Sequence, residues 1–102
     1  MKRTDYLFVI GYDGDKAVVH GQQRRRYGKL TTSQLLDEGL YKAAFCSADY
    51  ALQNGAAGAA EELDSVCVAM QQSTGRPHTV DDLRKLFGVF GVPADIKGVI
   101  VA

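Results

Sequence analysis

A β-hairpin between Tyr6 and His20 is the feature that most restricts how this chain folds. The segment reads YLFVIGYDGDKAVVH, so two apolar runs rich in β-formers flank the pair Asp13-Gly14. An Asp-Gly pair in this position favours a type I′ turn, because that turn needs positive φ at both central residues. We therefore predict an antiparallel hairpin with Asp13-Gly14 as its two-residue loop.

The position of this loop sets the predicted register of the hairpin. It places Ile10 opposite Ala17, and residues that lie directly opposite share a face of the sheet. The other face then carries three apolar side chains, those of Leu7, Val9 and Val18. Both faces are largely apolar, whereas a face exposed to water is typically polar. We therefore expect other protein surface to cover each side of the hairpin and shield it from water.

The length and composition indicate a single domain that spans residues 1–102. A chain of this size buries roughly 65% of the surface that its unfolded form exposes, so it can form a core without disulfides or metals. No apolar stretch approaches the ~20 residues that span a bilayer, and the N-terminus lacks the pattern of a secretory signal. We therefore expect a cytoplasmic protein with no membrane partner.

Helix signals fill the chain between the hairpin and the C-terminus. Thr31 followed by Gln34, and Thr79 followed by Asp82, are typical of capped helix starts. Apolar residues recur there at three- and four-residue spacing, and glycine or proline follows each run. These signals predict four helices. The first three span residues 31–38, 40–53 and 61–73, and the fourth begins at residue 79 and ends at residue 93 at the latest. The second and third of them form a helical hairpin, and polar side chains are expected on the exposed side of the second: Lys42, Asp49 and Gln53.

The elements together predict an α+β fold. The β-branched tail Ile96–Val101 indicates a third strand. We expect the hairpin and this strand to form a small sheet, with three to four helices inserted between strands two and three and packed on one face. The tail strand is expected to pair with the first strand, which places Tyr6–Tyr12 in the middle. Segment Gln22–Lys29 is interpreted as a surface loop or a frayed strand end, and Met1–Asp5 as frayed.

This packing leaves one face of the predicted sheet without a cover. Helices on the opposite side do not reach Leu7, Val9 and Val18, and contiguous apolar patches usually mark an interface. We therefore predict a two-fold homodimer that forms through these three residues. The alternative is that the second helix or the C-terminal segment wraps over this face. Our leading functional hypothesis is a non-enzymatic interaction or assembly module that acts as a homodimer, without a cofactor.

A basic segment supports the alternative hypothesis of nucleic-acid or polyanion binding. Seven of the 12 basic side chains but only three of the 12 acidic ones lie in residues 1–30, although the whole chain has no net charge. Arg24, Arg25, Arg26 and Lys29 could neutralise phosphates, and Tyr27 could stack on a base. The competing interpretation is a solvated loop whose arginines pair with acidic residues of the same or a neighbouring chain, namely Glu61, Glu62 and Asp64.

The sequence signals for a metal site or an acid–base site are weaker than the signal for the basic segment. Asp13 and Asp15 could hold a hard cation, but a calcium loop needs more oxygen ligands at regular spacing, so we interpret this stretch as a turn. His20 and His78 each stand alone, without metal-site spacing or a neighbouring nucleophile. No metal ligand is predicted.

The two cysteines, Cys46 and Cys67, fall at apolar positions of predicted helices. We interpret both as reduced, buried thiols of a cytosolic protein.

A small enzyme that combines one of the histidines, His20 or His78, with tyrosine or carboxylate groups at a subunit boundary is the third functional hypothesis. No catalytic residue is predicted.

Overall fold

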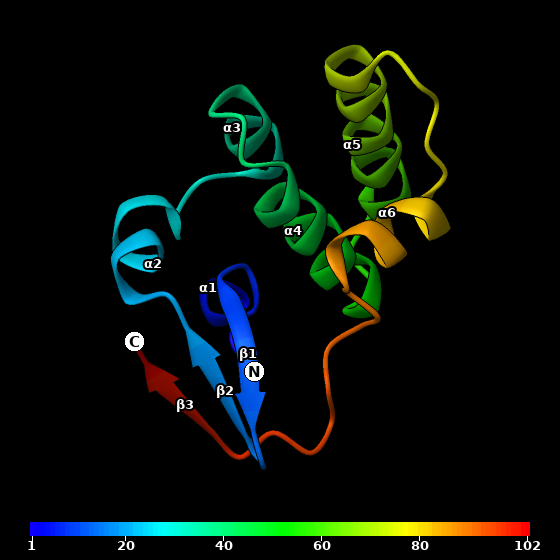
Figure 1. Cartoon of the computed structure of the whole chain (residues 1–102). Helices are drawn as coiled ribbons and strands as arrows, with labels where there is room; N and C mark the ends of the chain where they lie inside the picture. Colours follow the sequence, from blue (N-terminus) through cyan, green and yellow to red (C-terminus); the bar gives the residue numbers. More distant parts are fainter.

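The computed structural model describes residues 1–102, which form a three-stranded sheet at one end of a group of helices (Figure 1). The elements, in order, are α1 (Arg3–Tyr6), β1 (Val9–Asp13), β2 (Lys16–Val19), α2 (Gly21–Tyr27), α3 (Thr32–Asp37), α4 (Tyr41–Gln53), α5 (Ala59–Thr74), α6 (Val80–Phe87) and β3 (Gly98–Val101). The predicted α+β class is confirmed, with a hairpin, a C-terminal strand and helices inserted between the second and third strands.

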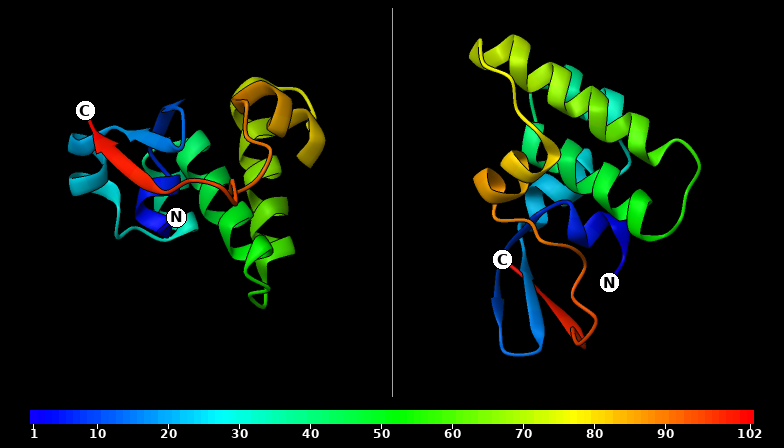
Figure 2. Two further views of the ribbon diagram at one scale, coloured as in Figure 1. Left: turned by 90° about the horizontal axis from the view of Figure 1, so that it is seen from below. Right: turned by 90° about the vertical axis from the view of Figure 1, so that its right-hand side faces the viewer.

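The two predicted capping boxes are confirmed. Both capping boxes form, with Thr31 and Gln34 at the start of α3 and Thr79 and Asp82 at the start of α6. The predicted helical hairpin is also present as α4 and α5, which pack side by side (Figure 2). None of the helices has the length and apolar character needed to cross a bilayer.

Strand β2 occupies the middle of the sheet, so the predicted pairing of the tail strand with the first strand is wrong. β1 pairs antiparallel with β2, and β3 pairs parallel with the other side of β2. β1 is interrupted by a bulge between Val9 and Gly11, and bulges occur preferentially at sheet edges. The helices α2 to α6 supply the long crossover that a parallel pair requires.

The hairpin turns one residue later than predicted. Asp13 pairs with Lys16, so the loop is Gly14-Asp15 and not Asp13-Gly14. Gly14 has a φ of 59°, and no residue other than glycine has positive φ in this chain. This pattern fits a type II′ turn, in which only the first central residue needs positive φ. Every predicted pairing across the hairpin shifts accordingly.

Segment Gln22–Lys29 is largely helical, and its prediction as a loop or strand end is wrong. α2 begins directly after β2, and Nδ1 of His20 caps it by accepting a hydrogen bond from the backbone N–H of Gln23 at 3.2 Å. Histidine is not among the preferred N-cap residues, which is why the helix start gave no sequence signal. Residues 3–6 form the short helix α1 instead of fraying.

The core is built around α4. Residues Ala43–Asp49 of this helix are all buried, and α3, α5 and α1 pack against it (Figure 2). Ala17 and Val19 of β2 have no exposed surface and belong to the same apolar cluster as Phe45. The inner face of the sheet is therefore joined to the helical core through its middle strand.

Leu7 lies in this core and not on a bare sheet face. It sits in the turn between α1 and β1, where it is 2% exposed within a single chain. The prediction that it forms part of an uncovered surface is therefore wrong, because the turn takes it out of the strand. Val9 and Val18 are half-buried. The exposed large apolar residues of the sheet are Ile10, Tyr12, Val99, Ile100 and Val101.

Truncation of Leu7 tests its place in the core. We expect Leu7→Ala to lower the free energy of unfolding by about 3 kcal/mol, the cost of removing a buried leucine side chain. Leu86→Ala is the matched control, since Leu86 is 60% exposed, and should cost less than about 1 kcal/mol. Urea unfolding followed by circular dichroism measures both values. Equal effects of the two substitutions would place Leu7 at the surface.

Candidate interaction surface

Strand β1 has one edge without a partner. It lies at the end of the sheet, and no backbone hydrogen bond joins it to any segment except β2. Hydrogen-bonded and non-hydrogen-bonded pairs alternate along an antiparallel ladder, and the pair that closes a two-residue loop is hydrogen-bonded. Asp13 and Lys16 close this loop, so the N–H and C=O of Tyr12 point away from β2. Such unpaired groups are a template for another strand.

An apolar groove of about 480 Å³ lies beside β1. Its second wall is the segment Gly88–Pro93, which leaves α6 on the side of β1 opposite to β2 (Figure 1). Ile10 and Tyr12 from β1 and Phe90 from the second wall are 59%, 50% and 75% exposed. Three large apolar side chains are thus exposed around a single groove. Its volume lies within the range of ligand-binding sites.

The polar groups of the groove are suited to binding more than to nucleophilic chemistry. Burial raises the pKa of the Cys46 thiol to about 12, so this side chain stays protonated at neutral pH. Burial also raises the pKa of Tyr12. Lys42 is the one cationic side chain in the lining, it is exposed, and it forms no ion pair within the chain.

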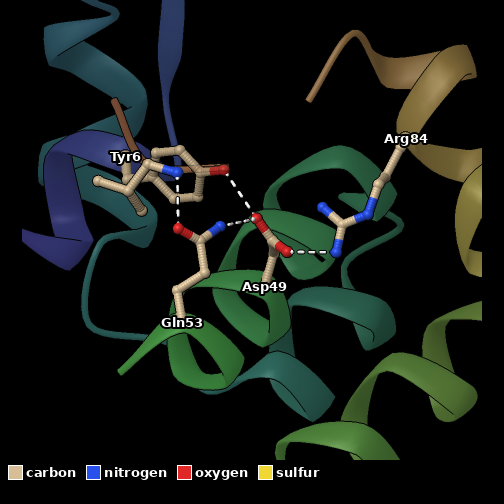
Figure 3. Close-up of polar contacts among 5 residues, drawn as sticks. Tyr6, Asp49, Gln53 and Arg84 are labelled. Atoms are coloured by element: carbon tan, nitrogen blue, oxygen red, sulfur yellow. Dashed lines mark hydrogen bonds and ion pairs between the residues drawn. The ribbon is translucent and has the colours of Figure 1, made fainter. Parts of the chain in front are cut away.

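A buried carboxylate connects the walls of the groove (Figure 3). Asp49 of α4 has no exposed surface, and one of its oxygens accepts hydrogen bonds from the Tyr6 hydroxyl at 2.9 Å and the Gln53 amide at 2.8 Å. Its other oxygen lies 2.8 Å from the guanidinium of Arg84 on α6. The amide oxygen of Gln53 accepts a hydrogen bond from the backbone N–H of Val92 at 2.9 Å. Two linked side chains of α4 thereby position the neighbouring segments, Asp49 for α1 and α6 and Gln53 for the second wall.

The predicted exposure of Asp49 is therefore wrong. A carboxylate is rarely buried without partners, and here hydrogen bonds and a guanidinium compensate for the loss of water. Burial, and then the hydrogen bond to Asp49, raise the pKa of Tyr6. Tyr6 consequently stays neutral and remains a hydrogen-bond donor. The available sequence signal was that Asp49 is the sole acid in α4, a helix that is otherwise mostly apolar.

The predicted basic residues lie on and beside α2, around a second, polar groove of about 400 Å³. No apolar side chain lines this α2 groove, which consists of Lys2, Thr4, Asp5, Arg24, Arg25, Gly28 and Lys29. Arg24 forms an ion pair with the buried Asp5, with 2.5 Å between the guanidinium nitrogen and the carboxylate oxygen. Arg25 and Lys29 are exposed and form no ion pair within the chain.

The remaining predicted members of the basic segment lie outside this groove. The guanidinium of Arg26 lies over the ring of Tyr27, 5.2 Å from its centroid, so the two side chains already contact each other. The acidic residues proposed as partners, Glu61, Glu62 and Asp64, form no ion pair with the α2 arginines within this chain. The structure therefore excludes same-chain pairing with these three residues.

Comparison with protein-family models, with curated proteins and with solved structures finds no match to this chain.

The histidines and cysteines are not brought together in either groove. His20 caps α2, and the half-buried His78 precedes α6 with its Nδ1 atom buried and unbonded. Cys46 is buried and Cys67 half-buried, and neither forms a disulfide. No group of three or more His, Cys, Asp or Glu side chains is arranged to hold a metal ion.

Removal of the Asp49 carboxylate tests its role as the connecting group. We expect Asp49→Ala to lower the free energy of unfolding by about 3 kcal/mol, because a buried ion pair loses one member and Tyr6 loses its acceptor. The exposed Asp64 on α5 supplies the control, and Asp64→Ala should change stability by less than about 0.5 kcal/mol. Chemical unfolding of both variants gives the comparison. A cost for Asp49→Ala no larger than for Asp64→Ala would contradict this role.

Proposed function

We propose that this protein is an interaction module that works by self-association, as a homodimer formed through its small sheet. The observation that carries the proposal is the distribution of exposed apolar residues. Five of the nine exposed large apolar side chains lie on the two edge strands, Ile10 and Tyr12 on β1 and Val99, Ile100 and Val101 on β3. Ile10 and Tyr12 share one groove with the exposed Phe90, and a contiguous apolar patch on a monomer usually marks an interface.

The chemistry of the apolar groove supports binding over catalysis. No histidine and no carboxylate lines it, and its thiol stays protonated at neutral pH. General acid–base or nucleophilic catalysis needs such groups near the pH of the solution. The groove instead offers apolar walls, one lysine and the unpaired backbone groups of a strand edge.

The burial of Leu7 changes which residues this proposal uses. Leu7 is unavailable to a partner, and Val9 and Val18 are half-buried. Ile10 and Tyr12 are more exposed than any of the three and lie next to them in the sheet. We therefore assign the interface to the exposed side chains of β1, Ile10 and Tyr12, with Val9 and Val18 at its margin.

Sedimentation velocity tests this proposal. We expect a dimer at tens of micromolar, and we expect Ile10→Lys to raise its dissociation constant at least tenfold, which corresponds to about 1.4 kcal/mol. Val68→Lys is the control, because Val68 is 54% exposed but lies on α5, away from the sheet. Circular dichroism confirms that both variants fold. A wild-type protein that stays monomeric at all concentrations would rule the proposal out.

A second candidate function, polyanion binding, is favoured by the composition of the α2 groove. Four cationic side chains and one carboxylate line it, without a single apolar residue. Cations gathered in one concave surface attract phosphate groups and release their counterions on binding. Since Arg24 is paired with Asp5, the cations available to a polyanion are Lys2, Arg25 and Lys29, with Arg26 and Tyr27 beside them.

This candidate predicts a salt-dependent affinity for a fluorescent single-stranded oligonucleotide. The double substitution Arg25→Ala/Arg26→Ala leaves the Arg24–Asp5 pair intact, and should reduce the slope of log affinity against log salt by roughly 1.4. The control is Arg76→Ala/Lys97→Ala, which removes the same charge from exposed positions elsewhere. Fluorescence anisotropy measures both slopes. Identical slopes for wild type and the Arg25/Arg26 variant would exclude binding at α2.

A further inference from the structure

We infer that the dimer forms edge to edge, with β1 of one copy pairing antiparallel with β1 of a second copy around a two-fold axis at Gly11. The two sheets of three strands then become one continuous sheet. This inference rests on the proposed function and names the surface and the partner that it uses. Both exposed edges of the sheet, β1 and β3, have to be considered as the joint.

Exposure favours β1 over β3 as the joining edge. Ile10 and Tyr12 are 59% and 50% exposed, and they face an apolar groove whose second wall adds the exposed Phe90. The exposed side chains of β3 are those of Val99, Ile100 and Val101, which are 36%, 37% and 49% exposed. Pairing at β1 therefore buries more apolar surface.

The register follows from the residues that the edge leaves unpaired. An axis at Gly11 sets Ile10 of each copy opposite Tyr12 of the other. Residues directly opposite share a face of the sheet. Ile10 of each copy therefore covers Tyr12 of the other copy, and both of these exposed side chains line the groove. The N–H and C=O of Tyr12, which point away from β2, face the second copy in the same step, whereas Ile10, the extra residue of the bulge, contributes through its side chain. Gly11 adds no side chain at the axis, where a Cβ would meet no atom of its own chain within 4 Å.

The charges at the two ends of β1 favour a second copy as the occupant. Lys42 lies at the Val9 end, where it lines two grooves together with Val9 and Ile10. Asp13 lies at the other end, and neither residue forms an ion pair within the chain. Antiparallel pairing brings Asp13 of the second copy to the end that carries Lys42, and the two-fold axis repeats this arrangement. The edge is thus complementary to itself in the antiparallel direction, and parallel pairing would place like charges together.

The bulge in β1 limits how far the pairing extends. It lies between Val9 and Gly11, and a bulge disrupts the regular ladder. The joint is therefore short, and its stability depends on the apolar side chains more than on the number of backbone hydrogen bonds. Each copy uses its β1 edge once, so the assembly closes at two chains.

Disulfide trapping tests this arrangement at its axis. Gly11→Cys places two thiols at a non-hydrogen-bonded pair with a Cα–Cα separation of about 4.5 Å, which a disulfide can bridge. Gly11 does not have positive φ and has open space around it, so cysteine fits there. The variant is made in a Cys67→Ser background, because Cys67 is half-buried, whereas Cys46 is buried and does not compete.

The control is Ile100→Cys in the same background, on the opposite edge of the sheet. In the proposed dimer the two Ile100 positions are separated by five strand spacings, roughly 24 Å, so they cannot be linked. We expect mild oxidation to convert most of the Gly11→Cys protein to a covalent dimer on non-reducing gels, and Ile100→Cys to remain monomeric.

The outcomes separate this inference from the proposed function. A dimer in sedimentation that Gly11→Cys does not trap, or that Ile100→Cys traps instead, overturns the β1 joint and leaves self-association standing. A monomer in sedimentation together with no trapping at either position overturns both.

Discussion

The buried carboxylate of Asp49 is the interaction on which the arrangement of this protein depends. It lies in the middle of the central helix and has no contact with solvent, so its charge must be compensated by the chain itself. The compensating groups come from α1 and α6, and through Gln53 from the segment after α6. A single buried charge thus determines where three separate parts of the chain lie relative to α4.

This constraint accounts for the surface to which we assign the function. α1 leads directly into β1, and the segment after α6 forms the wall opposite β1, so the Asp49 network fixes both sides of the apolar groove. The tail strand then reaches the sheet on the side of β2, where the N–H of Lys97 binds the carbonyl of Asp15 at 2.7 Å. β1 is left with an open edge beside an apolar groove. Such an edge can bind another strand through backbone hydrogen bonds.

The sequence predicted what depends on neighbouring residues. The capped helix starts, the helical hairpin and the presence of a β-hairpin all follow from patterns within a few positions, and all are present. The loop was misplaced by one residue because Asp13-Gly14 and Gly14-Asp15 both suit a tight turn. Strand order, the burial of Asp49 and the removal of Leu7 from the sheet depend on contacts between distant segments, which residue periodicity does not encode. The open β1 edge follows from that strand order, and so it could not be located from the sequence.

Amide hydrogen exchange of Tyr12 tests the central claim most directly, because its N–H is the group that the proposed joint covers. We expect this amide to exchange quickly in dilute protein and to become protected as concentration rises through the dimerisation range, while amides on α5 keep constant rates. Exchange of the Tyr12 amide at the same fast rate at every concentration, in a sample that sedimentation shows to be dimeric, would contradict the account.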